Sequence, residues 1–234
     1  MKMLLDFLYP KVCPGCGKIM TKSQRTFCTT CLDQVIFTDK NTCLKCGKPI
    51  EDNTKELCFD CNKKTRYFDE HRAAYVYKGV LRHAMYGFKY ANKRCYAKLF
   101  ARDIVLKNYD WLCRLQVDAI VPIPMYEVKK KIRGYNQAEK LADEISKMIN
   151  VPVNNALLVR SKNTIPMKNL TDVQRRINLE NAFICKGFNV KYNRLLLVDD
   201  IFTTGATFDS VASVLKANGV EKIYCVSVCV GWGS

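Results

Sequence analysis

The sequence contains no run of 18 or more apolar residues, which is about the length that a membrane-spanning helix needs. We therefore expect no membrane span. The first dozen residues have one leading Lys and a short apolar patch broken by Asp6 and Pro10, which is a weak match to a signal peptide. We expect the protein to be cytoplasmic.

Histidine is scarce, and neither of the two, His71 and His83, has a CxxC pair beside it, so we expect both to be non-ligands. Acidic residues are outnumbered by Lys and Arg, 22 against 38, for a net charge of +16. Residues 1–65 carry a net charge of +4. The remaining +12 of residues 66–234 suits an anionic substrate and also nucleic acid, although a solvated surface rich in Lys is common.

Cysteine is abundant instead: eight of the 13 form four CxxC pairs, each starting 15 residues after the last. Two thiolates on a tight turn converge on one metal ion, and two such pairs complete a tetrahedral Cys₄ zinc site. Sequential pairing predicts two structural Zn²⁺ ions, and spacing alone leaves interleaved pairing open. Disulfides are the rival interpretation, which a cytoplasmic chain disfavours. The predicted ligands are Cys13, Cys16, Cys28, Cys31, Cys43, Cys46, Cys58 and Cys61. The others, Cys95, Cys113, Cys185, Cys225 and Cys229, are expected to be buried thiols.

Residues 194–210, RLLLVDDIFTTGATFDS, are the most informative stretch. Four apolar residues run into Asp199 and Asp200, a pattern that predicts a strand buried on both faces of a parallel sheet. Thr203 or Thr204 is a good N-cap for the helix that the following spacing predicts. The two acids are therefore expected at the carboxyl end of a central strand, where open α/β sheets bind ligands.

The chemistry of this turn indicates a phosphorylated sugar. Backbone amides at a helix start, a glycine and several hydroxyls suit a phosphate, whereas two carboxylates suit a pair of sugar hydroxyls. An ordinary capped strand-to-helix junction is the alternative. The stretch resembles the phosphoribosyl pyrophosphate (PRPP) motif of type I phosphoribosyltransferases. The resemblance implies that Asp199 and Asp200 bind the ribose hydroxyls. The implied 5′-phosphate contacts are Thr203, Thr204, Gly205, Ala206 and Thr207.

Upstream, residues 117–123 predict a strand, followed by a turn and by an amphipathic helix from about Tyr135. In the resembled fold this turn, Pro124, Met125 and Tyr126, is the pyrophosphate loop. Residues 73–79 predict an early or edge strand, residues 80–109 two helices meeting near Asn92, residues 151–155 a strand, and residues 222–230 the last strand.

Residues 157–183 have little periodicity and many basic groups, which is typical of a lid over a polyanion. Three consecutive lysines at 129–131 are more typical of a solvated face. Of the basic residues here, only Arg133 is expected to contact a ligand. The candidate phosphate contacts are Lys89, Arg133, Arg160 and Arg175.

The order of these motifs narrows the resemblance. CxxC repeats, K-Y after a helix, VPIP followed by RGYNQAEKLA, and then RxKxT and RRxN before the PRPP motif are similar to the ComF family of competence-associated proteins. This implies an α/β fold with a type I phosphoribosyltransferase-like, mainly parallel sheet flanked by helices (residues 66–234), behind a small Cys₄ zinc-ribbon domain (residues 1–65). It also implies Mg²⁺ bound with PRPP. The family usually has T-P-P-Q in the lid, where this chain reads TIPM at 164–167, so the Gln contact has no match here.

Two hypotheses follow. The first is a PRPP-binding, Mg²⁺-dependent phosphoribosyltransferase-like protein with a role in DNA uptake, whose acceptor and turnover are undefined. Purine salvage is not expected, because Thr203 stands where purine-salvage relatives often place an acid. The alternative is an adaptor that binds single-stranded DNA within the uptake machinery, with a regulatory or vestigial PRPP site.

Overall fold

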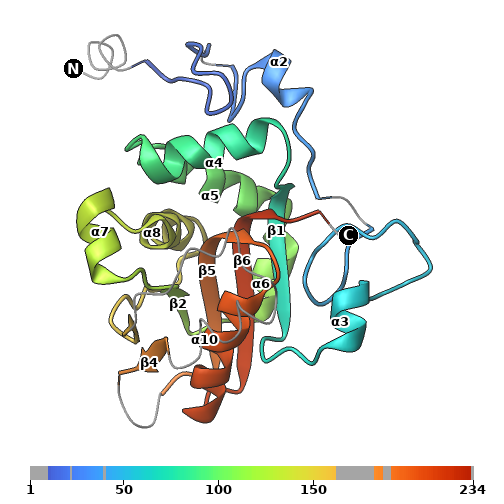
Figure 1. Cartoon of the computed structure of the whole chain (residues 1–234), viewed down its shortest axis with the longest axis vertical. Helices are drawn as coiled ribbons and strands as arrows, with labels where there is room; N and C mark the ends of the chain where they lie inside the picture. The colour runs from blue at the N-terminus through green and yellow to red at the C-terminus, as the bar shows by residue number, and fades with distance from the viewer. Residues whose placement is uncertain (1–9, 22, 39–40, 162–181, 187–190, 233–234) are drawn as a thin grey trace.

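The computed structural model describes residues 10–21, 23–38, 41–161, 182–186 and 191–232. Its centre is a four-stranded sheet in the order β1-β6-β5-β2, in which every neighbouring pair is parallel (Figure 1). An antiparallel pair, β3 with β4, lies apart from it. The strands are β1 (Glu70–Val76), β2 (Ala119–Pro122), β3 (Leu158–Arg160), β4 (Phe183–Cys185), β5 (Arg194–Phe202) and β6 (Lys222–Val230). The helices are α2 (Thr29–Leu32), α3 (Phe59–Lys63), α4 (Val80–Tyr90), α5 (Tyr96–Lys107), α6 (Tyr109–Leu115), α7 (Glu127–Arg133), α8 (Gln137–Ile149) and α10 (Ala206–Ala217).

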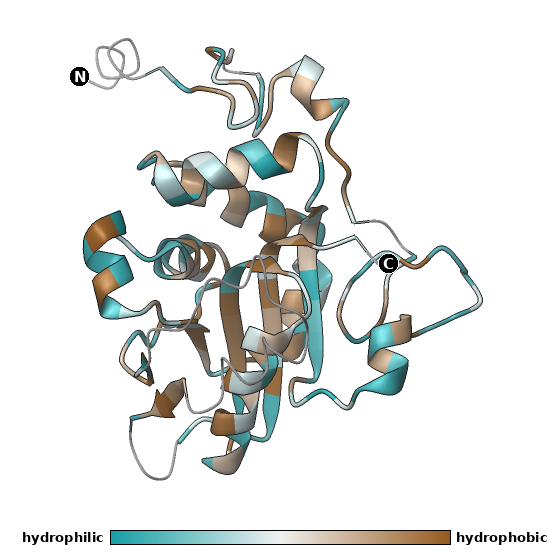
Figure 2. Cartoon of the chain, in the orientation of Figure 1, coloured by the Kyte–Doolittle hydropathy of each residue, from teal (hydrophilic) through white to brown (hydrophobic). Residues whose placement is uncertain are grey.

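Helices cover both faces of this sheet, which explains the unbroken apolar run of β5. Successive side chains of a strand point to opposite faces. Leu196 and Val198 accordingly join the core formed with α4, α5 and α8, whereas Leu195 and Leu197 join the core formed with α10. The central strands β5 and β6 are largely apolar in Figure 2, as expected when neither face meets water, whereas the edge strand β1 is more polar. The predicted α/β class, a mainly parallel sheet flanked by helices, is confirmed.

Several local predictions are corrected. Neither threonine caps α10, which begins at Ala206 with Gly205 as its N-cap residue at φ +81°. Helix α7 is missing from the prediction because its seven residues are too few for apolar periodicity to identify a helix, and none of them is buried. Residues 151–155 form no strand, and only a single bridge joins Val153 to Ile120. The meeting point of two helices near Asn92 is confirmed, with Asn92 itself at φ +53°.

The two cysteine-rich units pack on opposite faces of the sheet. Cys13, Cys28 and Cys31 belong to the core that contains α4 and α5. Cys43 and Cys46 belong to the core that contains α10. Figure 1 shows the first unit beside α4 and the second beside β1. The division into domains at residue 65 stays a prediction. Among the described residues, no helix has both the length and the apolarity that crossing a membrane requires.

Candidate functional site

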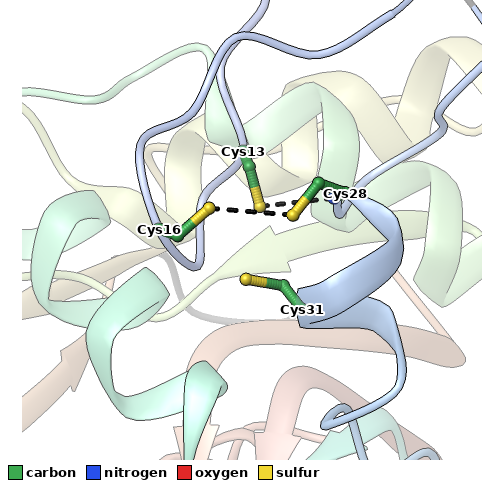
Figure 3. Close-up of side chains that lie close together, drawn as sticks. All are labelled: Cys13, Cys16, Cys28 and Cys31. Atoms are coloured by element: carbon green, nitrogen blue, oxygen red, sulfur yellow. Dashed lines mark hydrogen bonds between the residues drawn. The ribbon is translucent and has the colours of Figure 1, made fainter.

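The eight predicted ligands form two groups of four, and the pairing is sequential. Within Cys13, Cys16, Cys28 and Cys31 all sulfur atoms lie within 4.8 Å of one another (Figure 3), and the same holds for Cys43, Cys46, Cys58 and Cys61. A Zn–S bond of about 2.3 Å places tetrahedral sulfurs about 3.8 Å apart. The Cys16–Cys28 and Cys46–Cys58 sulfur separations are 3.7 and 3.6 Å. Each group therefore fits a structural Zn²⁺ ion.

The sequence repeat is also a structural repeat. In each unit the amide of the glycine after the first CxxC pair donates to the carbonyl of the leading cysteine, Gly17 to Cys13 and Gly47 to Cys43, both at 2.8 Å. Both glycines have positive φ, +74° and +68°, which a side chain would strain. These tight turns bring the two thiolates of a pair together.

The prediction of buried thiols elsewhere is only partly right. Cys225 and Cys229 are buried in β6, whereas Cys95 and Cys113 are exposed and Cys185 is half-buried. The prediction rested on the apolar character of cysteine. Cys95, however, lies just before α5, and Cys113 lies on the outward side of α6.

The predicted acid pair lies at the carboxyl end of β5, the central position expected from the sequence. Lys89, from the last turn of α4, forms an ion pair with Asp200 at 3.0 Å. The Asp200 amide donates to the Asp199 carboxylate at 2.8 Å. Burial raises the pKa of Asp199 to about 7 and the Asp200 charge adds to this, whereas the amide, Lys89 and Arg160 oppose it. Burial alone would lower the pKa of Lys89, but the two carboxylates outweigh it and raise that pKa.

A cavity of about 970 Å³ joins this pair to residues from four other parts of the chain. Seventeen residues line it, among them eight of those predicted to bind PRPP: Lys89, Pro124, Met125, Arg133, Arg160, Asp199, Asp200 and Thr207. Tyr126 is not among the lining residues and is instead the N-cap residue of α7. Lys129 also lines the cavity, contrary to the solvated face expected for the three lysines. Most of the stretch predicted as a lid (residues 157–183), namely residues 162–181 with Arg175, lies outside the described residues, and strands β3 and β4 flank that part.

The turn between β5 and α10 has the groups expected of an anion site. The first amides of a helix have no partner within the helix and point out of its N-terminus. The hydroxyl oxygen of Thr204 is buried and makes no hydrogen bond within the described part of the chain. Thr203 is exposed, and Gly205 adopts the left-handed conformation that favours glycine. A buried hydroxyl without a partner is costly, which fits a ligand that would accept its hydrogen.

Sequence reasoning missed the opposite wall of the cavity, formed by Asn92, Arg94, Asn136 and Gln137. Two of these residues join the end of α4 and the loop after it to the start of α8 and the loop before it: the Arg94 guanidinium donates to the Gly134 carbonyl at 3.2 Å, and the Gln137 amide donates to the Phe88 carbonyl at 3.1 Å. Their signal was present in the segments KYANKR and RGYNQ, where polar residues gather at helix boundaries.

Comparisons with known proteins agree with this arrangement. Residues 4–62 match the family model of the double zinc ribbon domain. The chain is 30% identical to Competence protein F of Haemophilus influenzae, over 90% of this chain and 93% of the relative. The chain belongs to the ComF family. This ComF-family protein is also 25% identical to DNA utilization protein YhgH of Escherichia coli K12, over 94% and 97% of the two chains. It is 25% identical to Competence protein ComFC of Bacillus subtilis, over 86% and 82%.

A solved structure matches this ComF-family protein more weakly. The hypoxanthine-guanine phosphoribosyltransferase of Schistosoma mansoni, in complex with IMP, covers 59% of this chain and 62% of its own, with 12% identity and a TM-score of 0.30. A likeness of this size carries no argument about function.

Proposed function

We propose that this protein binds PRPP together with Mg²⁺ and acts as a phosphoribosyltransferase-like component of DNA uptake in the cytoplasm. The place in DNA uptake is proposed from the printed names of the relatives, which are competence and DNA utilization proteins. The PRPP site is proposed from the geometry at the end of β5.

One observation carries the proposal: the acid pair and the start of α10 face one cavity whose other walls are basic. Asp199, Asp200 and Thr207 line it from β5 and α10, and Arg133 and Arg160 line it from elsewhere. Carboxylates accept hydrogen bonds from a diol, and basic groups with helix amides neutralise phosphates. A phosphorylated pentose presents both chemistries in one molecule, which a simple phosphate or a nucleobase does not.

The residues also suit a bound Mg²⁺ ion, since the ion prefers oxygen ligands and shares them with substrate phosphates. When bound, it would neutralise charge on the pyrophosphate leaving group. The chain itself would hold the ribose through its acid pair and steer the pyrophosphate with Pro124, Met125 and Arg133. Lys89, predicted to contact phosphate, instead forms an ion pair with Asp200 at 3.0 Å.

Isothermal titration calorimetry with PRPP and Mg²⁺ tests the proposal. The wild type should bind, and Asp199→Ala combined with Asp200→Ala should abolish binding because the acceptors for the sugar hydroxyls are removed. A matched control is Asp143→Ala combined with Glu144→Ala, which removes two adjacent acids of α8. Wild-type PRPP affinity in the β5 double variant would refute the site assignment. Pyrophosphate release with a panel of bases, nucleotides and DNA then identifies an acceptor.

A second candidate function, binding of single-stranded DNA, is favoured by an exposed aromatic pair at the cavity rim. Tyr86 and Tyr90 are 62% and 63% exposed, with ring centroids 5.1 Å apart. The Arg133 guanidinium lies 4.9 Å from the Tyr90 ring. Exposed aromatic rings beside positive charge are the platform on which unpaired bases stack.

Substitutions and the salt dependence of DNA affinity distinguish these two functions. Tyr86→Ala combined with Tyr90→Ala should weaken binding of a fluorescent oligonucleotide, by about 1–3 kcal/mol per stacked base. Asp199→Ala with Asp200→Ala should leave DNA binding intact. An oligonucleotide affinity that does not decrease as salt is added would contradict a basic binding face.

A further inference from the structure

The segment that directly follows the second zinc ribbon (residues 43–61) contacts α10, the helix that the phosphate-binding turn precedes. Just after its last ligand, the Arg66 guanidinium donates to the Asp209 carboxylate of α10 at 2.5 Å, and the Tyr67 amide donates to the same carboxylate at 3.1 Å. The Arg66 side chain is only 4% exposed. Burial lowers the pKa of Arg66, but the Asp209 carboxylate outweighs it and raises that pKa. A single buried cation thus joins the chain just after the second ribbon to the first turn of α10.

A second connection passes through the aromatic residue that ends β5. Phe202 is buried and stacks on His71, with ring centroids 4.2 Å apart. His71 in turn is within 2.7 Å of the carbonyl oxygen of the zinc ligand Cys46, through Nδ1. Phe202 directly precedes the turn, so the ribbon supports the turn on the strand side as well.

Both connections meet beneath Gly205. A Cβ atom placed there would lie 2.6 Å from the Phe202 ring and 3.1 Å from the Arg66 guanidinium. The backbone of the turn therefore lies directly against groups held by the second ribbon. If these groups shift, the amides and the Thr204 hydroxyl shift with them.

We propose that the second zinc ribbon is a positioning element for the phosphate-binding turn, acting through Arg66 and Phe202, so that zinc at this site and a phosphorylated ligand at the turn strengthen each other's binding. This rests on the proposed function. The first ribbon has no such role: it packs on the opposite face of the sheet, where Phe27 contacts Tyr75 edge to face at 5.8 Å and Thr26 accepts from Arg102 at 2.7 Å.

The first test separates the connection from the general stability of the ribbon. Arg66→Met combined with Asp209→Asn removes the buried ion pair without leaving either charge alone, and the introduced carboxamide still offers an acceptor to the Tyr67 amide. The matched control is Lys48→Met with Asp60→Asn, which removes a 2.8 Å ion pair inside the same ribbon. With zinc content and thermal unfolding checked, the Arg66 double variant should lose about five-fold or more in PRPP affinity, and the control should stay within about two-fold.

The second test follows from thermodynamic reciprocity and does not depend on the stability of those double variants. If zinc strengthens phosphate binding, ribose 5-phosphate must strengthen zinc binding by the same factor. Competition against a chromogenic chelator measures it in Cys16→Ser, which keeps the second quartet, and in Cys58→Ser, which keeps the first. Ribose 5-phosphate should raise zinc affinity in Cys16→Ser by about five-fold or more and leave Cys58→Ser unchanged.

The outcomes of these tests distinguish a failure of this inference from a failure of the proposed function on which it rests. Suppose that the wild-type protein binds PRPP, that the two double variants bind PRPP with equal affinity, and that ribose 5-phosphate does not change zinc affinity. These results would overturn the inference and leave the proposed function standing. An equal effect of the sugar on both quartets would also overturn it. Wild-type protein that binds neither phosphorylated pentose would refute the proposed function, and this inference with it.

Discussion

Replacing Gly205 by alanine tests how tightly the turn is held between β5 and α10. The residue has φ +81°, a conformation that costs a residue with a side chain about 1–2 kcal/mol. The added methyl group would also overlap the buried Phe202 ring at 2.6 Å. That ring is enclosed by His71, Phe68 and Phe208, so it has little room to move. Overpacking of this kind costs about 1–3 kcal/mol.

Gly219, at the other end of α10, provides the matched control. It has φ +93°, yet a Cβ atom there would meet nothing within 4 Å. Gly219→Ala should therefore lose only the conformational part, about 1–2 kcal/mol, whereas Gly205→Ala should lose about 2–5 kcal/mol. Against a total stability of about 5–15 kcal/mol, the difference between the two variants is large enough to resolve.

Urea unfolding of the zinc-loaded, reduced proteins, followed by circular dichroism, gives both values, provided that the slopes with denaturant agree. Gly205→Ala should also weaken PRPP binding, because the turn must move, and Gly219→Ala should not. Equal losses of stability within about 0.5 kcal/mol would refute the close approach of the turn to Phe202. Unchanged ligand affinity in Gly205→Ala would refute its place in the phosphate site.

Three further predictions concern charge and metal. Because the pKa of Asp199 is raised to about 7, its proton competes with ligand below that pH, so PRPP affinity should rise between pH 6 and 8 more steeply in the wild type than in Asp199→Asn. Lys89→Met removes an ammonium group whose charge lowers the pKa of Asp199, so the rise in calorimetric affinity should shift to higher pH; an unshifted profile would contradict this effect of Lys89 on Asp199. Zinc analysis should find two ions per chain and one in Cys28→Ser, whereas two in that variant would rule out the sequential sites.

The zinc ligands and the strand that ends in the acid pair could be predicted from the sequence, because both depend on neighbouring residues. The CxxC pairs are formed within four residues, and the glycine that follows each first pair turns the chain back on itself, so zinc binding follows from short-range geometry. In the same way, the apolar run at 195–198 predicts a strand buried on both faces, and the acids that follow it are necessarily at its carboxyl end.

The sequence does not predict contacts between residues that are far apart in the chain, because tertiary packing determines them. Arg66 and Asp209 are 143 positions apart, and no pattern near either residue indicates the other. The same holds for Lys89, which reaches Asp200 because α4 crosses the end of β5, rather than through any feature of the KYANKR segment. Helix α7 shows a third limit: its seven residues are too few for apolar periodicity to identify a helix, and none of them is buried.

The amino-acid sequence by itself determined the two kinds of chemistry in this protein, thiolates spaced for zinc and an acid pair before a helix start, because each depends on neighbouring residues. Only the tertiary structure decided how the parts combine: which cysteines share an ion, which basic groups line the cavity, and that the second ribbon packs beneath the turn. Those contacts join residues that are distant in the chain, and they exist only once both faces of the sheet are covered.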